Sequence, residues 1–153
     1  MNIYYFAYGS NMLSKRMLER IPEAKVEGIA CLPGWKLVWD KISKDGSGKA
    51  NLRREDGKVV WGVIYLIPES RVHTLDEIEG GYQRIDVEVQ RDQQGKLAAF
   101  TYVSEKRDES LLPFERYKEL VIKGAQEHSL PSDYIDEIKQ AMARPDSRDK
   151  AGK

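Results

Sequence analysis

Short apolar runs, separated by clusters of glycine, proline and aspartate, dominate the first two thirds of the chain. Seven mostly apolar segments are predicted to be strands: 2–8, 25–32, 35–39, 50–53, 58–67, 82–90 and 97–103. The run KVVWGVIYLI at 58–67 is nearly continuous apolar sequence, which is typical of a central strand buried on both faces. Turns are predicted at Pro33-Gly34 and at Glu55-Asp56-Gly57, because these residues favour turn conformations.

Apolar side chains at helical spacing predict four helices, at 12–21, 68–79, 113–125 and 131–142. Ser10 or Asn11 is expected to cap the first helix, and Gly80-Gly81 ends the second. Strands followed by two closing helices indicate an α+β fold in one domain, residues 1–142. Residues 143–153 carry no large apolar side chain and are predicted to be a disordered tail.

The chain carries 25 basic and 25 acidic residues, and a net charge of zero argues against nucleic-acid binding and against a polybasic membrane anchor. Its single cysteine, Cys31, excludes an internal disulfide and a cysteine-rich zinc cluster, and we expect it to be buried. No apolar stretch approaches the roughly 20 residues of a membrane span, and the N-terminus lacks signal-peptide features. We therefore expect a soluble, cytoplasmic protein.

The segment Phe6-Ala7-Tyr8-Gly9-Ser10-Asn11 is a candidate binding site at the end of a predicted strand. A strand that ends in Gly-Ser-Asn before a helix presents several backbone N–H groups, and such a concavity favours an anion. The alternative is an ordinary strand–turn–helix corner with Ser10 or Asn11 as its cap, and such corners are common.

Glu79 is a candidate functional residue because it breaks two local preferences. At about 100° per residue, its side chain shares the inward helix face of Val72 and Leu75. Glu77 points away from that face, and Asp76 lies at its edge. Glu79 also falls in the last turn, where the helix dipole disfavours negative charge, so that burial and dipole both act to raise a carboxyl pKa. The alternative is a frayed helix end with Glu79 turned to water.

The chain also contains a scatter of tyrosines: Tyr5, Tyr8, Tyr82, Tyr117 and Tyr134. Tyrosine is amphipathic, and most tyrosines are structural residues of the core or its rim. The pattern alone does not separate a structural role from a place in a binding site.

Four blocks of the sequence resemble the gamma-glutamylcyclotransferase-like superfamily and occur in the same order. They are YFAYGSNM at 5–12, VWGVIY at 60–65, LDEIEG at 75–80 and PFERYKELVIKGAQEHSLPSDY at 113–134. The resemblance covers roughly residues 4–140. The joint occurrence of the blocks is specific, whereas any one of them alone is weak.

The resemblance implies a small mixed β-barrel with flanking helices, in which the YGSN turn holds a gamma-glutamyl group. It implies that Glu79 is the catalytic acid/base residue. It further implies that the substrate is bound by Tyr5, Phe6, Ala7, Tyr8, Gly9, Ser10 and Tyr117. Asn11 and Tyr82 are two further possible pocket residues. Only two residues separate Glu79 from Tyr82, whereas glutathione-pathway members carry a longer insertion, so the accepted gamma-glutamyl compound is left open.

The activity implied by the resemblance is cyclisation of a gamma-glutamyl group to 5-oxoproline, with release of an amino acid or amine. This reaction needs no cofactor and no metal. The expected partner is a small gamma-glutamyl substrate, and neither a nucleic acid nor a membrane is expected to bind. The protein is expected to be a monomer or a homodimer. Two alternatives stay open: a same-fold enzyme acting on another gamma-glutamyl amine, and a non-catalytic binding protein on the same scaffold.

Overall fold

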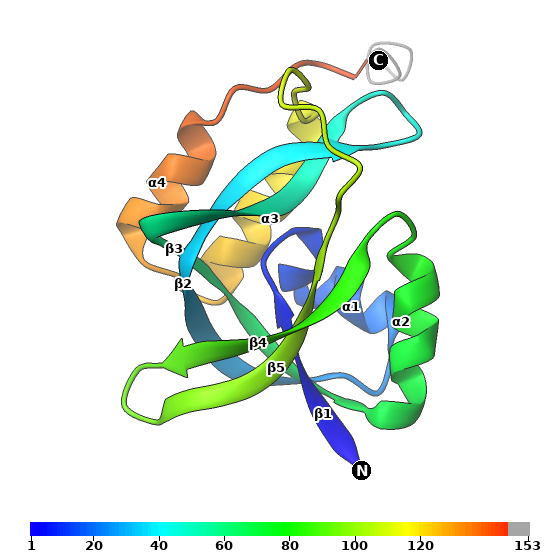
Figure 1. Cartoon of the computed structure of the whole chain (residues 1–153), viewed down its shortest axis with the longest axis vertical. Helices are drawn as coiled ribbons and strands as arrows, with labels where there is room; N and C mark the ends of the chain where they lie inside the picture. The colour runs from blue at the N-terminus through cyan, green and yellow to red at the C-terminus, as the bar shows by residue number, and fades with distance from the viewer. Residues whose placement is uncertain (147–153) are drawn as a thin grey trace.

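The structure is a computed structural model that describes residues 1–146, in which five strands close into a mixed barrel (Figure 1). The strands are β1 (Asn2–Ala7), β2 (Lys25–Ile42), β3 (Gly48–Pro68), β4 (Gln83–Arg91) and β5 (Gly95–Val103). Around the barrel they follow the order β1-β3-β2-β4-β5. The pairing of β1 with β5 is parallel, and the other pairings are antiparallel. The small mixed barrel that the resemblance implied is confirmed.

Helices flank the barrel, as expected. They are η1 (Ser10–Met12), α1 (Ser14–Arg20), η2 (Glu69–Arg71), α2 (Val72–Ile78), α3 (Glu115–Glu127) and α4 (Ser132–Gln140), where η denotes a 3-10 turn. Figure 1 shows α3 and α4 on one side of the barrel and α1 and α2 on another. None of the helices in residues 1–146 is long and apolar enough to cross a membrane.

The start of the first helix differs from the prediction. A 3-10 turn comes first, Leu13 is extended at φ −71 and ψ 114, and only then does α1 begin. Neither Ser10 nor Asn11 caps a helix with its side chain. Their side chains have other partners: the Ser10 hydroxyl accepts a hydrogen bond from Arg16, and the Asn11 amide donates to Glu79.

Strands β2 and β3 are longer than predicted, because neither proposed turn interrupts them. Pro33-Gly34 and residues 55–57 face each other within one antiparallel ribbon, where Pro33 pairs with Val59 and Trp35 with Arg54. The register shifts between these pairs, which is the mark of a β-bulge. Gly34 has φ +84 and Gly57 has φ +83, and glycines with positive φ serve bulges as well as turns. The sequence cue was therefore ambiguous.

The barrel core is built around the apolar run of β3. Val60, Val63, Ile64, Tyr65 and Ile67 are fully buried, so the predicted central strand is confirmed. Cys31 differs from its prediction, since it is only partly buried. It pairs with Gln90 where β2 meets β4 in the barrel.

The predicted disordered tail begins with residues that pack. The backbone N–H of Arg144 donates to the Pro113 carbonyl at 3.0 Å, and the N–H of Glu115 donates to the Arg144 carbonyl at 2.9 Å. The Arg144 guanidinium lies 4.5 Å from the centre of the Phe114 ring. Backbone pairing and a cation–aromatic contact thus replace the apolar anchors that the segment lacks. Residues 147–153 of the predicted tail lie outside the described residues.

Candidate active site

The YGSN turn, residues 8–11, is fixed from two sides. The Tyr65 hydroxyl on β3 donates to the carbonyl oxygens of Asn11 at 2.8 Å and Met12 at 3.0 Å. Helix α3 packs so close to the turn that a Cβ on Gly124 would lie 2.6 Å from the Leu13 nitrogen. A real Cβ atom is essentially never found less than 3.0 Å from a non-bonded heavy atom. Only a glycine at position 124 therefore lets α3 pack this closely against Met12 and Leu13, the residues that follow the turn.

Glu79 terminates α2, on the face that carries the buried Val72 and Leu75. Its side chain is 15% exposed, whereas that of Glu77 is 72% exposed, so the carboxylate of Glu79 turns inward. Its Oε1 accepts a hydrogen bond of 2.7 Å from Asn11 Nδ2 and lies 3.6 Å from Arg20 Nη1.

Burial raises the pKa of the Glu79 carboxyl above its ordinary value. The charge of Arg20 and the hydrogen bond from Asn11 act in the opposite direction, because both favour the carboxylate. A carboxyl group with a raised pKa is a stronger base than an ordinary carboxylate, which suits a residue that accepts a proton and later returns it.

Glu79 and the turn border one small cavity of about 40 Å³. Eight residues from the predicted site line it: Tyr5, Tyr8, Gly9, Ser10, Asn11, Glu79, Tyr82 and Tyr117. Phe6 and Ala7 do not line it and are fully buried in the core. The Phe6 ring packs so close to Gly62 that a Cβ there would lie 2.8 Å from it. Tyr134 lies elsewhere, in a groove outside the barrel.

Ala50 and Tyr102 complete the lining, and the sequence did not single out either residue. The N–H of Ala50 donates to the Tyr117 hydroxyl at 3.2 Å, and its carbonyl accepts from the Tyr82 hydroxyl at 2.7 Å. The backbone of β3 therefore positions two tyrosines. A small residue in a strand gives no cue to such a role, whereas Tyr102 follows Phe100 at strand spacing and could have been found.

The tyrosines of the cavity are neutral hydrogen-bonding groups. Burial raises the pKa of Tyr117 to about 12, and it raises the pKa values of Tyr5, Tyr8 and Tyr82 well above the ordinary value. Tyr5 accepts a hydrogen bond from Asn11 Nδ2 at 3.1 Å. Within residues 1–146, no acceptor is found for the hydroxyl protons of Tyr5 and Tyr117.

Several polar groups of the turn also have no hydrogen-bond partner in the described residues. In the described part of the chain, the backbone N–H groups of Gly9, Ser10 and Asn11 donate to no acceptor. The Oδ1 atom of Asn11 is buried and finds no donor there either. An unpaired buried acceptor costs about 1–3 kcal/mol, which a ligand donor would recover.

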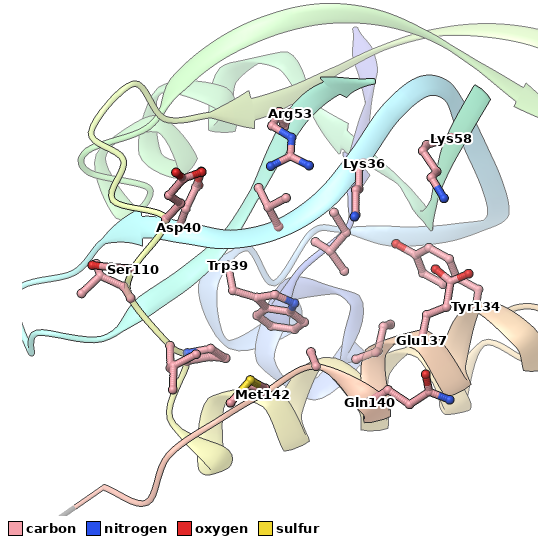
Figure 2. A pocket seen from close by; sticks show the side chains of 18 of the residues that line it. Lys36, Trp39, Asp40, Arg53, Lys58, Ser110, Tyr134, Glu137, Gln140 and Met142 are labelled. Carbon is pink, nitrogen blue, oxygen red and sulfur yellow. The ribbon is translucent and has the colours of Figure 1, made fainter. Parts of the chain in front are cut away.

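A second and larger hollow lies outside the barrel. It is a groove of about 940 Å³ between the β2–β3 ribbon, residues 109–113 and α4. Figure 2 shows Lys36, Arg53 and Lys58 reaching into it from the strands, and Tyr134 and Glu137 from the helix. Across residues 1–146, His, Cys, Asp and Glu side chains form no group of three or more that could hold a metal ion.

Comparison with known proteins places the chain in a family. The profile of the AIG2-like family matches residues 59–138. Human gamma-glutamylcyclotransferase is 33% identical over 144 residues, which cover 88% of this chain and 76% of that protein. The chain belongs to the AIG2-like, gamma-glutamylcyclotransferase family.

The family likeness extends to the three-dimensional structure. The solved structure of a gamma-glutamyl cyclotransferase superposes with a TM-score of 0.89 at 29% identity, over 96% of this chain and 92% of that one. Bovine gamma-glutamylcyclotransferase is 34% identical over 139 residues, which cover 85% of this chain and 73% of that protein. In this family member, Glu79 and Tyr117 fall within the matched residues 59–138, whereas Arg16, Arg20 and Lys41 precede them.

Proposed function

We propose that this chain is an enzyme that cyclises a gamma-glutamyl group to 5-oxoproline and releases the attached amino acid or amine. The observation that carries the proposal is Glu79, an inward-turned carboxyl group with a raised pKa, held by Asn11 in a tyrosine-lined cavity. Family membership supports the same reaction.

The reaction is an intramolecular aminolysis. The nitrogen of the uncharged alpha-amine attacks the gamma-carbonyl carbon, a new C–N bond closes the five-membered ring, and the bond to the departing nitrogen breaks. One proton leaves the attacking nitrogen and one proton is added to the departing nitrogen. Glu79 carries out both transfers: it accepts the first proton as a base and donates the second as an acid. General acid–base catalysis of this kind typically accelerates a reaction by about 10²–10⁴-fold.

The YGSN turn is suited to hold the gamma-glutamyl group. The open N–H groups of Gly9 and Ser10, with Arg16 bound to the Ser10 hydroxyl at 2.9 Å, favour the alpha-carboxylate. The buried, unpaired Oδ1 of Asn11 lies on a side chain that also holds Glu79, so an N–H of the alpha-amine can bind there once the substrate has entered. This arrangement would bring the attacking nitrogen next to its base.

The hydroxyl groups of Tyr5 and Tyr117 are candidates to stabilise the oxyanion that develops on the gamma-carbonyl oxygen. Both are neutral donors without an acceptor in residues 1–146. Fixed donors in a site shielded from water stabilise such charge more strongly than water does.

Substrate entry requires the cavity walls to separate. The cavity holds about 40 Å³, whereas ligand pockets are typically about 300–1,000 Å³. Tyr82 is a candidate for this movement, because it is only partly buried and follows Gly80 and Gly81, of which Gly81 has φ +89. The movement must break the hydrogen bond from its hydroxyl to the Ala50 carbonyl.

The proposal is tested by measuring 5-oxoproline release from a panel of gamma-glutamyl dipeptides, gamma-glutamyl amines and glutathione. We expect release from at least one class, without an added cofactor. If the folded protein binds 5-oxoproline but turns over no member of the panel, the proposal is wrong and a binding protein on this scaffold is favoured.

A further inference from the structure

The positively charged side chains around the cavity outnumber the carboxylates that line it. Glu79 is the one carboxylate among the lining residues, and its nearest cation is Arg20. Lys49 lies 4.2 Å from the centre of the Tyr117 ring and pairs with Asp45 at 3.5 Å.

Two further cations, Arg16 and Lys41, have no carboxylate within ion-pair distance in residues 1–146. Burial lowers the pKa of both, because it removes water from their charged forms. Partly buried cations without a carboxylate partner favour an anionic ligand.

The two cations do not line the cavity themselves, but each contacts a residue that does, and they come from different elements. Arg16 belongs to α1, and its Nε donates to the hydroxyl of Ser10 in the YGSN turn. Lys41 lies near the end of β2, with its ammonium 5.1 Å from the centre of the Tyr82 ring. A Cβ built on Gly81 would lie 2.9 Å from the Lys41 Nζ. The ammonium therefore covers the segment that follows Glu79.

A gamma-glutamyl amino acid carries two carboxylates, whereas a simple gamma-glutamyl amine carries one. The proposed function assigns the alpha-carboxylate to the turn and to Arg16. The second carboxylate belongs to the departing amine, on the far side of the gamma-carbonyl from the alpha-carbon. A cation beside Tyr82, separate from the turn, is placed to meet it.

We propose that Lys41 is a specificity-determining residue, which selects gamma-glutamyl substrates whose departing amine carries a carboxylate. This inference rests on the proposed function. Lys41 lies outside the sequence blocks that carry the family resemblance and outside the matched residues 59–138.

The test compares gamma-glutamyl-alanine with gamma-glutamyl-ethylamine, which share a skeleton and differ by one carboxylate. The wild-type protein is expected to favour the alanine compound by about 10- to 100-fold in kcat/KM, the range of one charge-assisted hydrogen bond, mainly through KM. Lys41→Met keeps the aliphatic stem and removes the charge. It should reduce kcat/KM for the alanine compound more than for the ethylamine compound, so that the ratio of the two values approaches one. The ratio is the readout, because Lys41 also lowers the pKa of Glu79 and its removal affects both substrates through that group.

Two variants control the comparison. Lys41→Arg keeps the charge and should retain most of the preference. Lys25→Met removes an exposed lysine at the other end of β2 and should leave both substrates unaffected. Equal kcat/KM values for the two substrates in the wild-type protein would overturn the inference, even if Lys41→Met did not fold.

An undiminished preference in folded Lys41→Met would overturn the inference as well. In both of these cases 5-oxoproline is still formed, so the proposed function stands. If neither substrate nor any other gamma-glutamyl compound yields 5-oxoproline, the proposed function fails and this inference fails with it.

Discussion

The cavity at Glu79 and the groove outside the barrel differ in size and in the ionisable groups that they hold. The groove holds about 940 Å³ and the cavity about 40 Å³. In the groove, Asp40 accepts a hydrogen bond of 2.8 Å from Asn51 and one of 3.1 Å from Arg107. Arg53, on the same groove, pairs with Glu55 at 2.8 Å.

The cavity instead combines a carboxyl group of raised pKa with polar groups that have no partner in residues 1–146, such as Asn11 Oδ1. Such groups are unfavourable for folding, and they are found where a ligand or a reaction uses them. The Tyr134 hydroxyl in the groove is also buried without a partner in residues 1–146, so an unpaired atom alone does not mark a chemical site. The cavity is distinguished by an unpaired acceptor on the same side chain that holds a carboxyl group of raised pKa.

The largest expected difference between the two regions comes from Glu79→Gln. The substitution keeps size and one hydrogen-bond acceptor but cannot take a proton, so turnover should fall about 10²-fold or more. Binding of 5-oxoproline should persist, because the YGSN turn is unchanged. Steady-state kinetics and calorimetric titration of 5-oxoproline measure the two quantities.

Matched substitutions elsewhere should leave turnover within about twofold of wild type, since surface changes away from specific contacts are small. Glu77→Gln alters a carboxylate that is 72% exposed two residues away, and Lys36→Gln alters the groove. Retention of most activity by Glu79→Gln would show that the base is another residue. Asp76, which accepts a hydrogen bond of 2.6 Å from Tyr102, would be the next candidate.

Gly9→Val is expected to have the next largest effect. A Cβ at position 9 would lie 3.2 Å from the Cβ of Ala50 and 3.4 Å from the Tyr117 hydroxyl, both of which line the cavity. The added methyl groups would occupy ligand space, so the Kd for 5-oxoproline should rise about tenfold or more. A large drop in Tm with unchanged affinity in the folded protein would favour a purely structural corner.

Arg20→Met tests the electrostatics of the cavity and should have a moderate effect. Arg20 lowers the raised pKa of Glu79, so its removal should move that pKa further upward. Because the base must be ionised, the acidic limb of the kcat/KM profile should shift to higher pH. An unshifted limb would mean that another group controls it.

The same pKa shift predicts a pH-dependent stability difference. A carboxyl group with a raised pKa binds more protons in the folded state, so its ionisation destabilises the fold as pH rises through that pKa. The free energy of unfolding of Glu79→Gln, relative to wild type, should therefore increase from acidic to neutral pH. Urea unfolding at several pH values measures this trend.

The sequence predicted most of the fold because local cues and tertiary structure agree. The apolar run of β3 identified the central strand, and helical spacing put Glu79 on the face of Val72 and Leu75. The two missed strand continuations, in β2 and β3, share one cause. Gly34 and Gly57 take positive φ in bulges rather than in turns, and a local glycine cue cannot tell these apart.

The composition of the candidate site was predictable to a smaller degree. The motif resemblance supplied Glu79, the turn and Tyr117, which lie together. It also included Phe6 and Ala7, which belong to the core. The contributions of Ala50, Arg20 and Lys41 depend on how β2, β3 and α1 meet around the barrel, and no spacing along the chain encodes that.

The smallest expected effect lies outside the cavity, at Arg144. Its guanidinium covers the Phe114 ring and donates to the Gly46 carbonyl at 3.3 Å, which joins the segment after α4 to the loop before β3. A contact of this kind is worth about 0.5–1 kcal/mol, so Arg144→Ala should lower Tm by roughly 1–4 °C in a domain of this size. Turnover should not change, because Arg144 does not line the cavity.

Lys123→Ala, at an exposed position of α3, is the control for removal of a long basic side chain. An unchanged Tm for Arg144→Ala would show that the backbone pairing with Pro113 and Glu115 suffices to hold this segment. A loss of turnover would instead connect the outer face of the barrel to the site at Glu79.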